Sequence, residues 1–264
     1  QFDQELEEKG YVEAANFDDG YVDDFAAVLR LANPRLKVVN DGCPGETTET
    51  FIKGSGVGGA YCDGGPTGSP FPKAFLHHAS PGTQLEDALA VAKEAGTKTI
   101  TLDIGANDIL QFLSHTCGFP VTFSCSEAEV EAEIGHVVTN VGVILAQLRA
   151  AAPSAKIVFF SQYNPYPTLL SPEGRGDATV EALNGAIRSV AAGFNVKFAN
   201  TLRVINFSGT HGGPEVGDIP TVCVFTAMCP GGTFNPASPE ADIHPTKAGY
   251  AAMAGVLTTA YLTP

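Results

Sequence analysis

The sequence has few basic residues, and no apolar run long enough to span a bilayer. Its 264 residues include 15 Lys and Arg against 29 Asp and Glu, a formal net charge of −14. Nucleic acid and anionic membrane surfaces repel so acidic a chain, so neither is expected as a partner. A membrane-spanning helix needs about 20 consecutive apolar residues, so no transmembrane segment is expected. The charged segment 1–10 lacks a signal-peptide pattern, so a signal peptide is expected either to have been removed or never to have existed.

The six cysteines lack the Cys-x-x-Cys spacing of zinc sites, and the histidines repeat no known ligand spacing, so no metal is expected. Proximity along the chain favours three disulfides, although other pairings are possible. Disulfides form in oxidising compartments, so the sequence favours a secreted protein. The favoured pairs are Cys43–Cys62, Cys117–Cys125 and Cys223–Cys229.

Apolar periodicity alternates between the helical and the extended pattern along the chain. Capping boxes open two of the helices, at Thr83/Glu86 and Ser126/Glu129, and Asp177 is expected to cap another. Segments 2–20, 54–82 and 207–241 are predicted to be loops. Helices are predicted at 21–31, 47–53, 84–94, from 127, 178–192 and 246–262, and strands at 36–40, 98–104, 156–162 and 196–199.

This alternation, with no break in composition, predicts one three-layer α/β/α domain over residues 1–264 with a parallel sheet. Sites in such sheets lie on the loops at the carboxyl ends of the strands. Three polar groups of residues stand at such positions. Gly45 follows the first predicted strand, 105–108 (Gly-Ala-Asn-Asp) follow the second, and His244 precedes the last helix.

These residues resemble the sequence blocks of the SGNH (GDSL) hydrolases, which are serine esterases and lipases on a flavodoxin-like fold. The N-x-x-x-x-G pattern of residues 40–45 resembles the second block of that family. The G-x-N-D of residues 105–108 resembles the third, and the D-x-H-P of residues 242–245 resembles the D-x-x-H-P turn of the fifth. The resemblance spans the chain from about Tyr21 to the C-terminus and implies a flavodoxin-like sheet.

The resemblance also implies roles in acyl transfer, without a cofactor. The Gly45 N–H and the Asn107 amide would stabilise the oxyanion, and His244 would be the general base. Simpler alternatives stand beside each role. Gly45 could serve a tight turn, Asn107 could be a helix N-cap with Asp108 in the first turn, and His244 could be a surface residue beside a helix cap.

The acid of the family motif stands three residues before its histidine, where this chain has Ala241. Asp242 could orient the ring through a shifted turn. The Ala241 carbonyl could replace the carboxylate, and Glu240 is a third candidate. Asp242 is the expected partner of His244.

The family's nucleophile block, G-D-S at the end of the first strand, has no counterpart in residues 1–20, which contain no serine. Ser55, in a glycine-rich loop, follows no strand. We expect a strand ending in a G-D-S-like block to precede Gln1, because without this central strand buried backbone groups would be unpaired. The competing possibility is that residues 1–20 replace the strand without its serine.

The expected function is that of a secreted carboxylic-ester hydrolase acting on a small-molecule or lipid ester. The alternative is an inactive relative that binds acyl or glycan ligands in the same cleft. The loop 163–167 and the apolar residues 222–225 are candidates for the wall of that cleft. A flavodoxin-like cofactor binder is disfavoured, because no phosphate-binding glycine loop follows a strand.

Overall fold

The structure, a computed structural model, describes residues 20–43, 45–54, 82–119, 124–167, 175–206, 219–236, 238 and 241–263. The chain divides into two compact units. The first unit consists of Gln1–Val38, Phe160–Ala182 and Ala199–Pro264, and the second unit consists of Val39–Phe159 and Leu183–Phe198. The expectation of a single domain over residues 1–264 stays a prediction.

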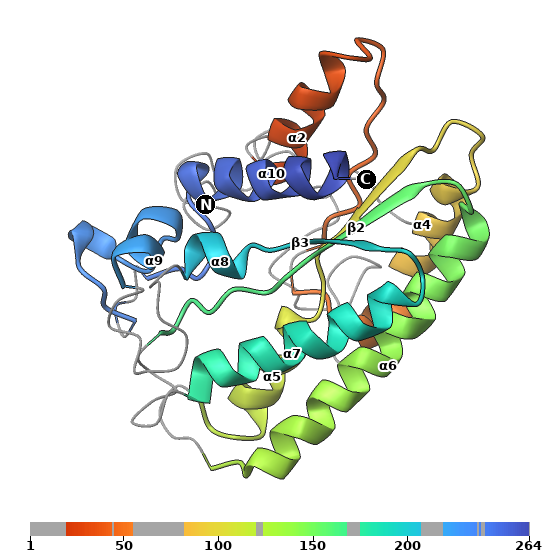
Figure 1. Cartoon of the computed structure of the whole chain (residues 1–264). Helices are drawn as coiled ribbons and strands as arrows, with labels where there is room; N and C mark the ends of the chain where they lie inside the picture. The colour runs from red at the N-terminus through yellow and green to blue at the C-terminus, as the bar shows by residue number, and fades with distance from the viewer. Residues whose placement is uncertain are drawn as a thin grey trace. The chain divides into compact units, whose positions relative to one another are not determined.

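Within the described residues, the sheet has three strands side by side in the order β1 (Thr99–Leu102), β2 (Lys156–Phe160) and β3 (Lys197–Ala199) (Figure 1). β1 and β2 are parallel, with Thr99 opposite Lys156. All the apolar residues of β2 are fully buried, as expected of a strand covered on both faces. The strands confirm the predictions at 98–104, 156–162 and 196–199, and they adjoin in the order expected of the last three strands of a flavodoxin-like sheet.

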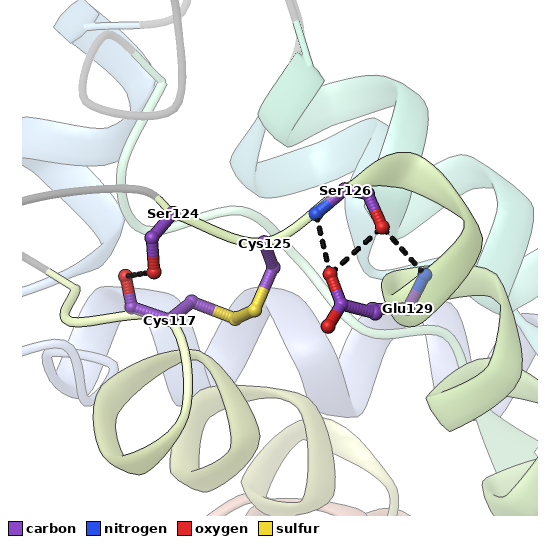
Figure 2. The surroundings of a disulfide bond; sticks show 5 residues. All are labelled: Cys117, Ser124, Cys125, Ser126 and Glu129. Atoms are coloured by element: carbon purple, nitrogen blue, oxygen red, sulfur yellow. Dashed lines mark hydrogen bonds between the residues drawn. A yellow bond between two sulfur atoms is a disulfide. The ribbon is translucent and has the colours of Figure 1, made fainter.

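In the part of the second unit that the structure describes, five helices are present, and the longest of them, α6, contacts α3, α4 and α5. The stripe predicted on α6 from Val130 to Leu148 is buried. The predicted capping box is also present, since the Glu129 side chain accepts the Ser126 N–H at 2.8 Å (Figure 2). The helices are α3 (Thr48–Lys53), α4 (Gln84–Ala92), α5 (Ala106–His115), α6 (Glu127–Ala151) and α7 (Arg175–Ala192).

α6 is also the only helix in the described ranges that is long and apolar enough to cross a membrane by length and composition. Core helices of folded domains have the same properties. α6 buries seven apolar side chains and packs on three helices of its own unit, which is the behaviour of a core helix.

The disulfide Cys117–Cys125, with Cα atoms 5.0 Å apart, closes the chain just before α6 and confirms the predicted pair (Figure 2).

The first unit is built around the C-terminal helix α10, which packs against α2, α8 and α9. The Phe25 ring of α2 meets Tyr261 of α10 edge-on, with the ring centroids 5.6 Å apart. α10 confirms the predicted last helix and is capped by Thr246. The elements are α2 (Tyr21–Arg30), α8 (Leu202–Ile205), α9 (Ile219–Phe225), the short 3-10 helix η4 (Pro230–Gly232) and α10 (Lys247–Leu262).

Three sequence predictions are wrong. Residues 36–40 form no strand, since no described residue pairs with them, and Val38 and Val39 are 40% and 44% exposed. A β-branched run becomes a strand only when a neighbour satisfies its backbone. Asp177 lies inside α7, which the structure describes from Arg175, so it does not stand before the helix as a cap would. The segment 207–241, predicted to be a loop, contains the helices α9 and η4. The proline and glycine residues of these helices led to the prediction of a loop.

Other predictions lie outside the described residues. They concern most of the acidic segment 2–20, most of the loop 54–82 with Ser55, and the partner Cys62. Cys43 itself is disulfide-bonded.

Two glycines of the second unit should respond oppositely to alanine. Gly105 has φ 112°, and a Cβ there would lie 3.2 Å from the Val137 Cγ1 atom. Gly105→Ala should therefore lower the free energy of unfolding by about 1–3 kcal/mol. Gly135, inside α6, has open space around it, so Gly135→Ala should raise that free energy by about 0.5–1 kcal/mol. Urea denaturation of both variants measures this, and equal effects would contradict the assignment.

Candidate functional site

The His244 side chain, in the first unit, is held by the carboxylate of Asp242. Its Nδ1 atom lies 2.6 Å from Asp242 Oδ1, and the same oxygen accepts the His244 backbone N–H at 3.0 Å. The Asp242 side chain is buried, whereas the His244 side chain is 42% exposed. The structure therefore places a partly exposed imidazole on a buried carboxylate.

This contact selects one tautomer of the ring. A carboxylate that accepts from Nδ1–H leaves Nε2 as the nitrogen that can take up a proton, as a general base requires. Burial raises the pKa of Asp242, but the hydrogen bonds and charge of His244 outweigh burial and hold that pKa below its ordinary value. The carboxylate is thus ionised at neutral pH and can accept the hydrogen bond from Nδ1–H of His244.

The turn that carries His244 pairs with the end of α9 through its backbone. Ala227 N–H donates to His244 O at 3.1 Å, and Ala227 O accepts Asp242 N–H at 3.1 Å. Thr246 N–H donates to Phe225 O at 3.0 Å. The disulfide Cys223–Cys229, the third predicted pair, closes the chain around this partner segment, with Cα atoms 5.1 Å apart.

The start of α10 fixes the other side of the turn. The Thr246 hydroxyl accepts Gly249 N–H at 3.2 Å and donates to Val224 O at 2.9 Å. Gly249 allows this approach, because a Cβ at that position would overlap the Phe225 carbonyl. His244 thus lies two residues before the helix cap, as the sequence suggested, but with its ring paired.

Two tyrosines of the loop after β2 lie near this pair. Tyr163 donates from its hydroxyl to Ile243 O at 2.6 Å. The pKa of Tyr166 lies above its ordinary value, mainly because the side chain is buried and to a smaller extent because of the charge of Asp242. The loop that the sequence marked as a cleft wall thus contacts the His244 turn.

In the second unit, α5 holds the chain around Gly45. Asn107 Nδ2 donates to Glu46 O at 3.1 Å, and Gln111 Nε2 donates to Gly45 O at 2.9 Å. Asn107 and Gln111 are four residues apart, so they lie on one face of the helix. Gly45 has a φ angle of 74°, in the left-handed region that favours glycine. The alternative that Gly45 serves a tight turn therefore agrees with its backbone conformation.

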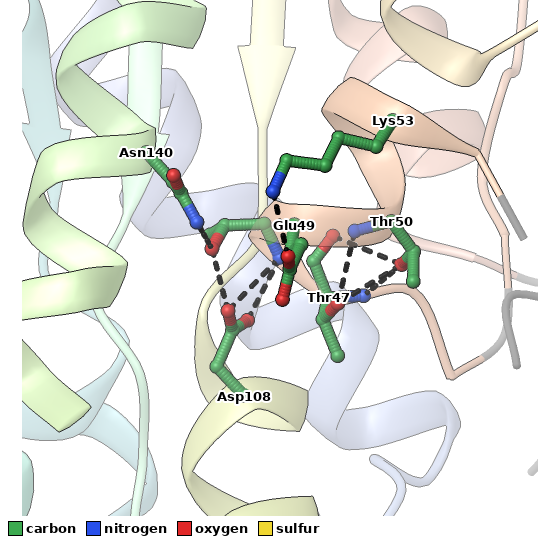
Figure 3. A network of polar contacts seen from close by, with 7 residues as sticks. Thr47, Glu49, Thr50, Lys53, Asp108 and Asn140 are labelled. Atoms are coloured by element: carbon green, nitrogen blue, oxygen red, sulfur yellow. Dashed lines mark hydrogen bonds and ion pairs between the residues drawn. The ribbon is translucent and has the colours of Figure 1, made fainter. Parts of the chain in front are cut away.

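Asp108, which follows Asn107 on α5, binds the start of α3 (Figure 3). Its carboxylate accepts Thr48 N–H at 2.9 and 3.0 Å and the Thr48 hydroxyl at 2.5 Å. Asn140 of α6 donates to the same hydroxyl at 3.1 Å. Burial of Asp108, opposed by these hydrogen bonds, raises its pKa to about 6.

The structure bears on several alternatives left open by the sequence. Asn107 is not a helix N-cap, since α5 begins at Ala106 and Gly105 is the cap. Asp242, the expected partner, contacts the His244 ring at 2.6 Å. Glu240 lies outside the described residues. The structure thus joins His244 with Asp242 in the first unit, and Asn107 with the chain next to Gly45 in the second.

Two supporting residues were missed by sequence reasoning. Gln111 could have been found, because it stands one helical turn after Asn107 on the same face. The link from Tyr163 to Ile243 spans 80 residues of chain, and no local pattern indicates it. Within the described ranges, no three His, Cys, Asp or Glu side chains gather as a metal site would require.

Asp108 should make stability depend on pH. Its pKa is about 6 in the folded protein against an ordinary value of 3.8, so the folded state binds the proton more tightly. The contribution of Asp108 to stability is full below about pH 4 and falls as the pH rises to about 6, by up to about 3 kcal/mol. We expect the free energy of unfolding of wild type, minus that of Asp108→Asn, to fall over this range. Denaturant titrations measure this difference, and a flat one would contradict the assignment.

The disulfide Cys223–Cys229 should stabilise the His244 turn locally. Replacing both cysteines by serine should cost about 2 kcal/mol, because the cross-link restricts the unfolded chain. Hydrogen exchange should also speed up at the N–H groups of Ala227, Asp242 and Thr246, which pair the two segments. The matched control is the double serine variant of Cys117 and Cys125, which should leave these three amides unchanged. Equal protection in both variants would refute this role.

Comparison with known proteins agrees with this fold. The chain resembles a mutant of an acetyl-xylooligosaccharide esterase from Geobacillus Stearmophilus, at 15% identity and a TM-score of 0.54 over 93% of this chain and 82% of that one. It also resembles an extracellular lipase from Streptomyces rimosus, at 14% identity and a TM-score of 0.53 over 92% and 87%. An acetyl xylan esterase matches at 11% identity and a TM-score of 0.53 over 93% and 92%. These likenesses confirm the expected α/β fold.

Comparison with curated protein sequences finds no match. A family model, in contrast, covers nearly the whole chain, from residue 9 to residue 252. The match includes the regions of Gly45, of Asn107 and of the Asp242–His244 turn, on which the resemblance was based. The chain belongs to the GDSL-like lipase/acylhydrolase family.

Proposed function

We propose that this protein is a secreted carboxylic-ester hydrolase that works by serine acyl transfer with His244 as its general base. The family supports ester hydrolysis in general. The observation that carries the specific proposal is the 2.6 Å contact between His244 Nδ1 and the buried Asp242 carboxylate. That contact leaves Nε2 of a partly exposed ring to exchange protons with a substrate.

In the proposed acylation step, a serine hydroxyl attacks the ester carbonyl and its proton passes to His244 Nε2. Asp242 stabilises the imidazolium ion that forms. The negative charge that develops on the carbonyl oxygen is assigned to two donors, the Gly45 N–H and the Asn107 amide. When the tetrahedral intermediate collapses, the leaving alkoxide takes the proton back from His244 as the alcohol.

In deacylation, water replaces the alcohol. His244 Nε2 takes a proton from the attacking water, and the acyl–serine bond breaks. The serine oxygen recovers the proton, and the carboxylic acid is released. The clamp of Asn107 and Gln111 on the Gly45–Glu46 backbone supports the assignment of the oxyanion donors, because donors of fixed position need no reorganisation during reaction.

The proposed substrate is a small-molecule or lipid carboxylic ester. Two structural neighbours are named as esterases of acetylated xylan or xylooligosaccharide and one as a lipase, so both a sugar acetate and a lipid ester fit the proposal. The proposal of secretion rests on the disulfides, which persist in oxidising compartments.

Hydrolysis of p-nitrophenyl esters from acetate to palmitate tests the proposal. His244→Ala should lower kcat by about 10³-fold or more, since the base is lost. Asn107→Ala should lower it by about 10²–10³-fold, since one oxyanion donor is lost. His136→Ala is the matched control, because that histidine lies on α6 with its side chain 77% exposed, and its rate should equal that of wild type.

A fluorophosphonate probe tests the nucleophile separately. The probe reacts with an activated serine, and mass spectrometry of the labelled peptide identifies which one. Labelling of wild type that is lost in His244→Ala would support serine acyl transfer. Wild-type protein with neither turnover nor labelling would refute the proposal and favour the acyl- or glycan-binding alternative.

A further inference from the structure

We propose that Tyr163 is a positioning residue for the proposed general base, because its hydroxyl holds the peptide group that joins Ile243 to His244. The inference rests on the proposed function for its catalytic consequence. The Tyr163 hydroxyl donates to the Ile243 carbonyl oxygen at 2.6 Å, a short hydrogen bond for this pair of groups. Both residues belong to the first unit.

The peptide group in question is held at both of its polar ends. Its carbonyl, from Ile243, accepts the Tyr163 hydroxyl, and its N–H, from His244, donates to Asp242 Oδ1 at 3.0 Å. A change in the backbone torsion angles beside this peptide would reorient the His244 side chain. The ring would then lose the 2.6 Å contact of its Nδ1 atom with Asp242. The Tyr163 hydrogen bond therefore restricts the rotation that would misalign the ring.

Tyr163 can act in this way because its own backbone is anchored. The next residue, Asn164, is 2% exposed, and its backbone pairs with the side-chain amide of Asn206. Asn164 N–H donates to Asn206 Oδ1, and Asn206 Nδ2 donates to Asn164 O, both at 2.8 Å. The Asn164 side chain in turn accepts Tyr166 N–H at 2.9 Å, which closes the turn. The phenol thus extends from a fixed point at the end of β2.

The Tyr163 bond differs from the backbone pairing that joins the His244 turn to the end of α9. The bonds to Phe225 and Ala227 join backbone to backbone, so no side-chain substitution removes them selectively. The bond from Tyr163 depends on one hydroxyl oxygen. Tyr163→Phe therefore removes this hydrogen bond and keeps the aromatic ring.

The test measures the tautomer of the His244 ring by ¹⁵N NMR, and kcat and KM for ester hydrolysis by kinetics. Long-range ¹H–¹⁵N spectra distinguish the Nδ1–H from the Nε2–H tautomer, and the spectrum of His244→Gln assigns the signal. Wild type should show the Nδ1–H tautomer, and Tyr163→Phe should shift population toward Nε2–H. In the same variant kcat should fall about three- to tenfold, the equivalent of one neutral hydrogen bond, with KM within about twofold.

Tyr261→Phe is the matched control, since that ring packs on Phe25 of α2, and it should change neither the tautomer nor kcat. Asn206→Asp is a second variant, which removes the donor to Asn164 O without touching Tyr163. It should shift the tautomer in the same direction. Near-UV circular dichroism establishes that each variant is folded.

An unchanged tautomer in both folded variants would overturn the proposal, even if kcat fell, because the effect would then not pass through His244. The NMR measurement needs no turnover. If wild type hydrolyses no ester, the proposed function fails, while the tautomer shift still decides whether Tyr163 orients the ring.

Discussion

Hydrogen bonding of irregular backbone is the constraint on which both candidate loops depend. A turn at the end of a strand or helix has N–H and C=O groups that the regular element does not satisfy. Around Gly45, side chains of α5 take up two carbonyl groups and one N–H group. Around His244, backbone groups at the end of α9 and the Tyr163 hydroxyl form hydrogen bonds with the N–H and C=O groups of the turn. In both places the groups that complete the backbone also fix the residues with proposed chemical roles.

This dependence explains which parts of the molecule were predictable from the sequence. Helices with local signals were predicted well, because a capping box such as Ser126/Glu129 and a buried stripe such as that of α6 are contained in a few turns of chain. The sequence also indicated His244, Asp242 and Asn107 as candidates. The strand at 36–40 was wrong because pairing is not a local property, and α9 was missed because a short helix with a proline resembles a loop. The Tyr163 link could not be predicted, since its partner is distant in sequence.

The Asp108 network shows that a loop can be fixed at the expense of stability. Its carboxylate receives three hydrogen bonds from Thr48, yet burial still raises its pKa to about 6. At neutral pH the protein thus keeps a buried charge that a neutral side chain would avoid. An ionised carboxylate forms stronger hydrogen bonds than a neutral group and holds the start of α3 more firmly. Precise placement of the chain from Gly45 to Thr48 is a sufficient physical reason to retain the buried carboxylate of Asp108.

The pairing between the His244 turn and the end of α9 has an evolutionary consequence. Its bonds to Phe225 and Ala227 use only backbone atoms, and the disulfide that closes the segment uses only Cys223 and Cys229. The side chain of Val224, between the two cysteines, therefore takes no part in these bonds. Val224, 56% exposed, can be exchanged without breaking any of these bonds. Relatives could thus vary this exposed position while the proposed base stays in place.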